Sequence, residues 1–403
     1  VCKNTRFFDY QRRFLHFFLY VCNLKTKGMD ALKMVDLAGQ YGGIKSEIDA
    51  AIERVLTTTN FINGSEVTDF ANHLGNYLSV RHVIPCGSGT DALQITLMAL
   101  GLQPGDEVIT VPFTFVAPVE VIELLHLRCK FVDVDWATFN MDISQLESMV
   151  TERTKAIIPV HLFGQCCQME AILTFAKKHH LYVIEDACQA IGTEYRFKNG
   201  EIKKAGTIGH IGCTSFFPSK NLGCYGDGGA IFTQNDTLAE KIRSIANHGA
   251  PKRYHYSQIG VNSRLDTIQA AILDVKLRYL SQYIKSRQWA AERYNQELES
   301  ISFLELPTTA PYSTHTYHQY TLKVKENLRD EVAQKLREAG IPYGIYYPSP
   351  LHCQPAYYHL GYQKGDFPIS EKLCESVISL PMHTELTEEQ IAYICTVLKG
   401  IRE

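Results

Sequence analysis

The chain has 403 residues, of which 45% are hydrophobic and 21% charged, and its formal net charge is -3. This composition is typical of a globular protein with a large core, and the length favours two lobes. The weak charge gives no reason to expect nucleic acid or an anionic membrane as a partner.

Two further features bear on where the protein works. The twelve cysteines are scattered and form no pair of C-x-x-C units, which favours a reduced, cytoplasmic setting without a zinc site. No segment reaches the ~20 apolar residues that cross a bilayer, so no membrane is expected. Residues 1–28 are aromatic and basic and lack the features of a signal peptide. We expect them to be an N-terminal extension, either upstream of the true start or docked on a neighbouring subunit.

Residues 30–75 are predicted to form a helical arm around the loop "TTTNFINGSEV". From residue 81 onward, short apolar runs predict strands at "HVIPC", "DEVITV", "CKFVDVD", "KAIIPVHLF" and "LYVIEDA". The stretch "QMEAILTFAKKHH" has helical spacing and joins the last two runs as a strand, helix, strand unit. The pattern predicts an α/β lobe whose mostly parallel sheet is covered by helices.

The pattern changes near residue 281, where the charged helical stretch "SRQWAAERYNQELES" leads into "THTYHQYTLKV" and a helix at "LRDEVAQKLREAG". We therefore expect the arm and a large domain over residues 29–280, and a smaller α+β domain over residues 281–403.

The segment "CGSGTDAL", residues 86–93, follows a predicted strand and opens a helix. Small residues let backbone amides approach an anion, and a helix N-terminus favours negative charge. The segment fits neither a P-loop nor a dinucleotide fingerprint. It is either a phosphate-binding turn or a plain glycine turn with Thr90 as the helix N-cap.

Two charged residues could complete a cofactor site. Asp186 ends a buried strand, the position at which open α/β sheets place ligands, and Lys220 stands in the serine- and glycine-rich stretch "SFFPSKNLGCYGDGG". A carboxylate can keep a pyridine nitrogen protonated, and a lysine can form an imine. With the anion-binding turn they describe a pyridoxal phosphate site, whereas Lys220 alone would be read as a solvated surface lysine.

Six segments carry a family resemblance: "PCGSGTDALQ", "VPFTFVA", "VHLFGQ", "VIEDACQAIG", "SFFPSKNLGCYGDGGAI" and "NSRLDTIQAAIL". In this order they resemble the DegT/DnrJ/EryC1/StrS family of nucleotide-sugar aminotransferases, and the similarity runs from about residue 34 to about residue 400. The resemblance implies a pyridoxal-phosphate-dependent transferase of fold type I. It also implies a homodimer in which each subunit completes the other's active site.

The resemblance assigns the catalytic and ring-binding roles. Lys220 would bind pyridoxal phosphate as an imine and then act as the acid/base that moves a proton between cofactor and sugar. Asp186 would pair with the pyridine nitrogen, and Gln189 would lie near the ring hydroxyl, unless it is only a hydrogen-bonding residue at the strand end. Phe115, in "PFTF", would stack on the ring.

The phosphate is assigned to four residues by the same resemblance. Gly89 and Thr90 would offer backbone amides and a hydroxyl, and Ser215 would add a second hydroxyl. Asn262 would reach the phosphate from the neighbouring subunit. Arg264 could contact the nucleotide diphosphate, because guanidinium suits bidentate phosphate contacts, or it could brace the dimer.

For the substrate, "GIYYPSPLHCQPAYYH" resembles the segment in which a tyrosine or histidine of the small lobe approaches the sugar nucleotide. His352 and Tyr346 are the first candidates, followed by His318 and Tyr320. A metal site on His352 and His359 is not expected, because no third ligand lies nearby at helical or turn spacing.

The implied reaction is a transamination with ping-pong kinetics. An amino acid, glutamate by expectation, would convert the cofactor to pyridoxamine phosphate, which then aminates a nucleotide-linked ketosugar. A dTDP- or UDP-linked 3-keto sugar is preferred over a 4-keto sugar, in polysaccharide or lipopolysaccharide biosynthesis. Lys220 argues against the family's dehydratases, in which a histidine replaces it.

Two rival functions stay open. A non-catalytic regulator or binding protein on the same fold would be expected to lose Lys220, Asp186 or the phosphate residues. A different pyridoxal phosphate reaction, such as a decarboxylation, would need no nucleotide groove. The sequence does not name the nucleotide, the sugar or the pathway.

Overall fold

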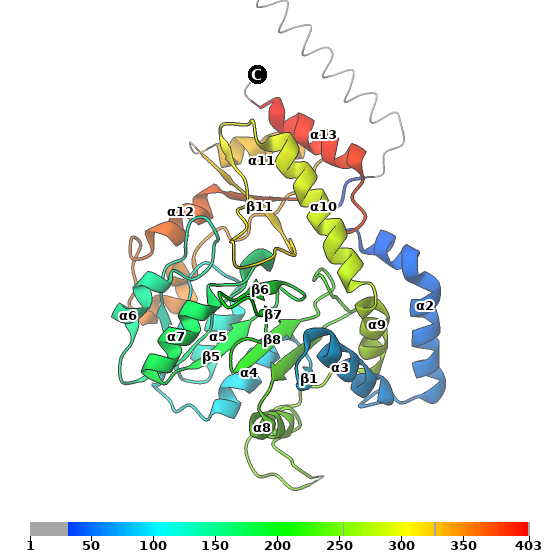
Figure 1. Ribbon diagram of the computed structural model, residues 1–403, viewed down its shortest axis with the longest axis vertical. Coiled ribbons are helices and arrows are strands. Elements are labelled where there is room, and N and C mark those ends of the chain that lie inside the picture. The colour runs from blue at the N-terminus through cyan, green and yellow to red at the C-terminus, as the bar shows by residue number, and fades with distance from the viewer. Residues whose placement is uncertain (1–30, 253, 326–327, 402–403) are drawn as a thin grey trace, which may run out of the picture.

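The computed structural model describes residues 31–252, 254–325 and 328–401. The predicted extension, residues 1–28, lies outside these ranges. Figure 1 shows two parts, a large sheet with its helices and, at the top of the view, a smaller group of helices around β11.

The large sheet has seven strands in the order β1-β9-β8-β5-β4-β2-β3. Its strands are β1 (His82–Cys86), β2 (Glu107–Thr110), β3 (Arg128–Phe131), β4 (Thr154–Ile157), β5 (Tyr182–Asp186), β8 (Ile211–Ser215) and β9 (Gly229–Thr233). Neighbours from β8 to β3 pair in parallel, whereas β9 is antiparallel to β1 and β8. The predicted mostly parallel sheet is therefore confirmed. The sequence analysis located β1 to β5 but did not locate β8 and β9.

Helices cover both faces of this sheet, which explains why its central strands, such as β5 and β8, are almost entirely buried. Helices α4 (Gly89–Leu100), α5 (Ala117–Leu124) and α8 (Asp236–Ala246) share one hydrophobic core, and α7 (Met169–His179) belongs to another. The short helix α6 (Leu146–Met149) precedes β4, and the two-stranded ribbon β6 (Glu194–Arg196) and β7 (Ile202–Lys204) follows β5.

The arm before the large sheet is helical, as the sequence predicts. It consists of α2 (Leu37–Thr58) and α3 (Ser65–Leu78), joined by the expected loop. Asp36 caps α2 by accepting a hydrogen bond from the Gly39 amide. Helix α2 buries Ile48 and Val55 against α9 (Thr267–Leu277). Figure 1 places α2 at the right-hand edge of the molecule, outside α9.

The second sheet is antiparallel and has the order β10-β11-β12. Its strands are β10 (Leu304–Glu305), β11 (Tyr320–Val324) and β12 (Val377–Leu380), and they share a core with α10 (Leu280–Leu298), α11 (Arg329–Glu338) and α13 (Glu388–Lys399). The predicted fold class, a large α/β lobe with a smaller α+β C-terminal lobe, is confirmed.

The segment before β12 returns to the large lobe. It contains η3 (Leu351–Cys353), η4 (Pro355–Leu360) and α12 (Pro368–Ser376). Leu351 and Phe367 belong to the core of the large lobe, so the C-terminal part of the chain packs on both sheets. Residues 350–371 are called the strap below.

None of the helices within residues 31–252, 254–325 and 328–401 is long and apolar enough to cross a bilayer.

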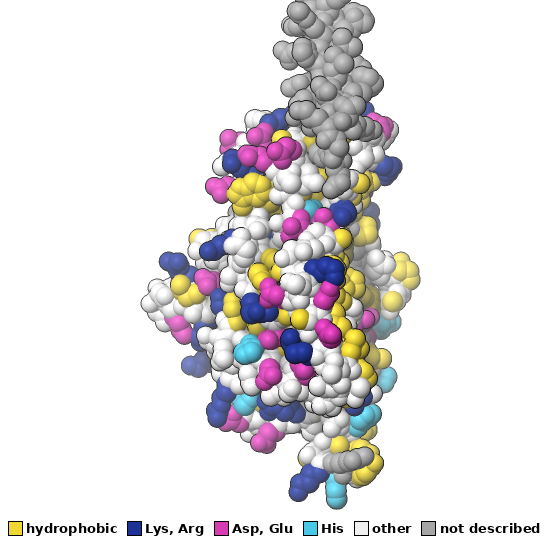
Figure 2. All heavy atoms as spheres, turned by 90° about the vertical axis from the view of Figure 1, so that its right-hand side faces the viewer, with side chains coloured by type: hydrophobic (Ala, Val, Ile, Leu, Met, Phe, Trp, Pro, Cys, Tyr) yellow, Lys and Arg dark blue, Asp and Glu magenta, His cyan; other side chains and the backbone are white. Residues whose placement is uncertain are grey.

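The side of the molecule that faces right in Figure 1 carries hydrophobic side chains between charged ones (Figure 2). Leu56 at the end of α2, and Phe61 and Ile62 after it, are exposed.

Candidate active site

Lys220 lies in the loop that joins β8 to β9. Its backbone amide donates a hydrogen bond to the Phe217 carbonyl, over 2.8 Å. Gly223 allows the next turn to close, because a Cβ atom there would lie 2.4 Å from the Pro218 carbonyl oxygen. The Lys276 amine, from α9, donates to the Gly223 carbonyl over 2.5 Å and so anchors the loop to this helix.

Lys220 is partly exposed as a residue, whereas its amine is buried. Burial lowers its pKa, while the nearby Cys188 and Asp186 act in the opposite direction. A lower pKa increases the fraction of neutral amine, which is the nucleophilic form. The structure therefore brings Lys220 close to Asp186, as the sequence analysis expects.

Asp186 ends β5 at the carboxyl edge of the parallel strands, where open α/β sheets bind ligands. Its side chain is 5% exposed and accepts a hydrogen bond from the Cys188 amide over 3.1 Å. The next residue inward, Glu185, pairs with His161 over 2.8 Å and also accepts three backbone amides. This buried pair holds the end of β5 rigidly.

The turn before α4 packs directly against this edge. A Cβ atom on Gly89 would lie 2.7 Å from the Ser215 Cβ and 2.9 Å from the Cys188 sulfur, so only glycine fits. Ser88, rather than Thr90, is the N-cap of α4, and it accepts a hydrogen bond from the Asp91 amide. Thr90 lies in the first turn, which leaves its side chain free of the capping role.

Gln189 connects this edge of the large sheet to the segment that precedes the strap. Its side-chain amide donates to the Tyr347 hydroxyl over 3.1 Å, and its carbonyl accepts from the Phe163 amide over 2.9 Å. Burial raises the pKa of Tyr347, with Asp186 contributing in the same direction. The structure thus places Tyr347 at the site, one residue after the predicted Tyr346. Two adjacent tyrosines gave the sequence analysis no means of choosing between them.

His318 is the other predicted substrate residue that reaches this region. It is 6% exposed, and its Nδ1 atom is buried without a hydrogen-bond partner among the described residues. Burial and the charges of Lys220 and Arg287 hold the pKa of His318 well below its usual range. A neutral imidazole with a free ring nitrogen therefore lies near Lys220.

Three predicted residues lie at the outer side of the site. Phe115 is 54% exposed, so its ring is available to a ligand or a second subunit. Asn262 is exposed and Arg264 partly exposed. Between them, Ser263 donates to the Asp91 carboxylate over 2.5 Å and accepts from the Gly87 amide over 2.9 Å, which ties this segment to the turn before α4.

Two predicted residues are engaged elsewhere. Tyr320 is fully buried in the core of the small lobe, where its hydroxyl donates to Asn295 over 2.7 Å. His352 is 1% exposed and pairs with Glu371 over 3.0 Å. Both side chains have partners within the chain, Asn295 for Tyr320 and Glu371 for His352. Their substrate roles stay predictions.

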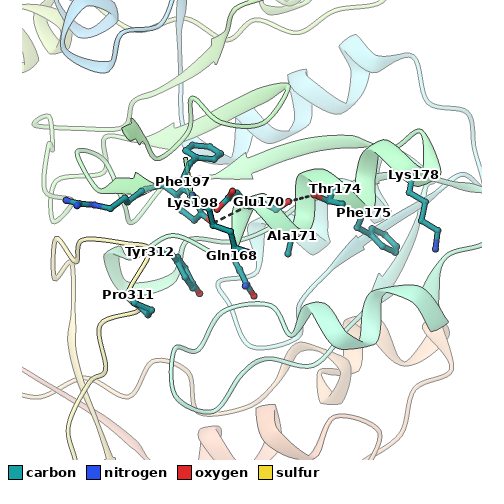
Figure 3. A pocket seen from close by; sticks show the side chains of 12 residues that line it. Gln168, Glu170, Ala171, Thr174, Phe175, Lys178, Phe197, Lys198, Pro311 and Tyr312 are labelled. Atoms are coloured by element: carbon teal, nitrogen blue, oxygen red, sulfur yellow. Dashed lines mark hydrogen bonds between the residues drawn. The ribbon is translucent and has the colours of Figure 1, made fainter. Parts of the chain in front are cut away.

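A separate hollow of about 700 Å³ lies between α7 and the β6–β7 ribbon. Figure 3 shows Gln168, Glu170, Phe197 and Tyr312 on its walls. None of the predicted site residues lines it, so it is distinct from the site around Lys220.

A large α/β lobe that presents a lysine, a strand-end carboxylate and a glycine turn at one sheet edge has the features of a pyridoxal-phosphate-dependent enzyme. Residues 43–399 match the model of the DegT/DnrJ/EryC1/StrS aminotransferase family. The chain belongs to this family.

Two relatives illustrate its range. The chain is 45% identical to a UDP-2-acetamido-2-deoxy-3-oxo-D-glucuronate aminotransferase of Pseudomonas aeruginosa, over 91% of this chain and 99% of the relative. It is 46% identical to a pleiotropic regulatory protein of Geobacillus stearothermophilus, over 90% of this chain and 96% of the relative.

Two solved structures have the same fold. Streptomyces venezuelae DesV in complex with a ketimine intermediate superposes with a TM-score of 0.89 at 34% identity, covering 93% of this chain and 100% of that one. Bacillus subtilis NtdA with bound pyridoxamine phosphate superposes with a TM-score of 0.82 at 32% identity, covering 89% and 82%.

Proposed function

We propose that this protein is a pyridoxal-phosphate-dependent aminotransferase that moves an amino group from an amino acid to a nucleotide-linked 3-keto sugar. One observation carries the proposal: Lys220, Asp186 and the Gly89–Ser215 contact meet at the carboxyl edge of the large sheet. Each supplies a different requirement of the cofactor, and family membership supports the same reaction.

The residues present fit the cofactor. The bare backbone of Gly89 faces Ser215 and leaves a cradle that any Cβ atom would fill. Backbone amides at the start of α4, the Thr90 side chain and the Ser215 hydroxyl would hold the phosphate, and Asn262 of a second subunit would complete it. Pyridoxal phosphate supplies a ring that accepts the electrons left when a C–H bond next to nitrogen breaks.

The chain's own groups then have defined tasks. Asp186 would face the ring nitrogen and favour its protonated form. The Lys220 amine would move a proton between a carbon of the cofactor and a carbon of the substrate, and its lowered pKa suits a general base. Gln189, which donates to Tyr347 over 3.1 Å, would lie near the ring hydroxyl. Glutamate as donor and ping-pong kinetics complete the proposed cycle.

The preference for a 3-keto sugar rests on the relative from P. aeruginosa, which is named as an aminotransferase of a UDP-linked 3-oxo sugar. A 4-keto sugar is the alternative. The substrate residues predicted from the sequence stay candidates, and the structure adds Tyr347, which contacts Gln189. Assaying a panel of dTDP- and UDP-linked 3-keto and 4-keto sugars for glutamate-dependent amination distinguishes a 3-keto from a 4-keto substrate.

A homodimer is part of the proposal. Phe115 next to the site is 54% exposed, and Tyr225 at the end of the lysine loop is 36% exposed. Exposed aromatic side chains at a cofactor site suit burial by a second subunit. A cytoplasmic setting in polysaccharide or lipopolysaccharide biosynthesis remains an expectation of the family.

A regulatory role is the second candidate, because a relative at 46% identity is named a pleiotropic regulatory protein. Lys220, Asp186 and the phosphate turn are all retained in this chain, which favours catalysis. The two functions differ in one property, turnover of an amino donor.

The decisive experiment is the visible spectrum of the protein with pyridoxal phosphate, before and after glutamate. Wild type is expected to show the band of a lysine-bound cofactor, which glutamate bleaches. Lys220→Ala is expected to lack the band, and Lys203→Ala, a surface lysine on β7, is expected to keep it. A wild-type protein without the band would overturn the cofactor assignment, and a band that no amino acid bleaches would favour the regulatory role.

A further inference from the structure

The strap holds a group of metal-binding side chains that the cofactor chemistry does not use. His352 and Cys353 lie in η3, and Glu371 lies in α12. One ligand atom of each lies within 4.8 Å of those of the other two, and His352 Nε2 is 3.0 Å from Glu371 Oε1. Among the residues that the structure describes, no other three histidine, cysteine or acidic side chains converge in this way.

We propose that His352, Cys353 and Glu371 bind a zinc ion. Imidazole, thiolate and carboxylate are the ligands that zinc prefers, at bond lengths of about 2.0 to 2.3 Å. In a tetrahedral site these lengths put neighbouring ligand atoms roughly 3.3 to 3.8 Å apart, so only small side-chain movements are needed. One thiolate and one carboxylate also neutralise the charge of the ion.

The surroundings of His352 leave room for a ligand. The ring is 1% exposed, and its Nδ1 atom has no hydrogen-bond partner among the described residues. Its other nitrogen, Nε2, faces Glu371. The hydrogen bonds of this buried ring are therefore incomplete within the described chain.

Access from solvent is available on the other side of the group. Cys353 and Glu371 are both partly exposed, so an ion reaches them directly and a water molecule fills the fourth position. Zinc binding releases the proton of the Cys353 thiol. The sequence analysis dismissed a metal at His352 because it looked for a third ligand along the chain, whereas Glu371 arrives from a later helix.

The ion would join the two ends of the strap. Near the first end, the Leu351 amide donates to the Pro112 carbonyl of the large lobe over 2.9 Å. At the second end, the amides of Ile369 and Ser370 donate to the Asp133 carboxylate. A metal that binds only the folded strap adds its binding free energy to folding and so stabilises the strap on the large lobe.

The test uses the cofactor-loaded protein, purified with a thiol reductant, stripped with a chelator and titrated with zinc or cobalt(II). Wild type is expected to bind one ion per chain after gel filtration. Cobalt(II) is expected to give the d–d bands of a tetrahedral site, at longer wavelengths than the cofactor band. Cys353→Ser and Glu371→Gln are expected to weaken binding at least about tenfold.

Matched controls separate this site from other ligands. His359→Gln removes a histidine that pairs with Glu123 over 2.6 Å, outside the group, and Cys395→Ser removes a buried cysteine of α13. Both are expected to bind zinc as wild type does. Circular dichroism establishes that each variant folds, and Cys353→Ser decides the matter if Glu371→Gln does not fold.

The proposal is overturned if the wild type binds no cobalt(II) in a tetrahedral site, or if Cys353→Ser binds zinc as tightly as wild type. The readout is metal content and affinity, so its result is independent of whether the protein is an aminotransferase.

Discussion

Asp186 is a buried carboxylate that accepts a hydrogen bond from the Cys188 amide over 3.1 Å and interacts with the charge of the nearby Lys220. Burying a carboxylate is costly unless hydrogen-bond donors or cations face it. In the proposed function the protonated ring nitrogen of the cofactor would be a further cation that faces Asp186.

Replacing Asp186 by Asn tests this role. Asn keeps the shape and the acceptor for Cys188 but removes the charge, so the activity is expected to fall at least about 100-fold. The dissociation constant of pyridoxal phosphate should rise as well. Steady-state kinetics and spectrophotometric titration measure the two effects. Glu201→Gln, on the surface before β7, serves as the matched carboxylate control. Unchanged activity in Asp186→Asn would contradict the ring-nitrogen role.

At the scale of elements, the loop between β8 and β9 depends on helix α9. Lys276 of α9 is 1% exposed, and its amine donates to the Gly223 carbonyl three residues after Lys220. Burial lowers the pKa of Lys276 to about 8, from an ordinary value of 10.5. Helix α9 therefore anchors the loop that carries Lys220 through Lys276, an amine whose pKa lies only a little above neutral pH.

The lowered pKa of Lys276 makes the stability of the folded protein depend on pH in one direction. Between pH 8 and 10.5 the unfolded chain keeps its proton on Lys276 while the folded chain has lost it. The unfolded state therefore binds more protons in this window, and stability from this group rises with pH. Below pH 8 the cost of burying the charged amine is fully present.

Replacing Lys276 by Met should remove this dependence. The stability of wild type relative to the variant is expected to increase by roughly 2 kcal/mol between about pH 7.5 and about pH 9.5. Urea unfolding at both values measures it, with Lys203→Met as a surface control. A pH-independent difference would show that Lys276 titrates normally.

At the scale of the whole molecule, Asp133 fastens the C-terminal segment to the large lobe. The residue follows β3 and is 2% exposed. Its carboxylate accepts hydrogen bonds from the Ile369 and Ser370 amides and from the Ser370 hydroxyl. Helix α12 has no side-chain cap from its own N-cap residue. Asp133, from the large lobe, caps the helix instead.

Replacing Asp133 by Ala is expected to lower the free energy of unfolding by about 3 kcal/mol or more. Each hydrogen bond to a charged group contributes about 1.5 to 3 kcal/mol, and the helix loses its cap. Denaturant unfolding measures the loss. Asp142→Ala, which removes a local cap at a short 3-10 helix, is expected to cost about 1 kcal/mol. Equal losses in the two variants would contradict a fastening role for Asp133.

Local patterns determined much of this architecture. Strands β1 to β5, helix α7 and the helical arm follow from runs of apolar residues at strand or helical spacing. Lys220, Asp186 and the turn before α4 were also identified from sequence, because short motifs set their backbone surroundings. The boundary between the domains, placed at residue 281, stays a prediction, and α10 begins at Leu280.

Contacts between distant segments were decided only by the tertiary structure. Tyr347 rather than Tyr346 meets Gln189, Tyr320 enters the small-lobe core, and Glu371 joins His352. Side-chain direction and burial depend on which elements pack together, and no local pattern encodes that packing. Sequence alone therefore determined strands β1 to β5 and the candidate residues Lys220 and Asp186, because local patterns encode them, while the tertiary structure decided which distant side chains contact one another.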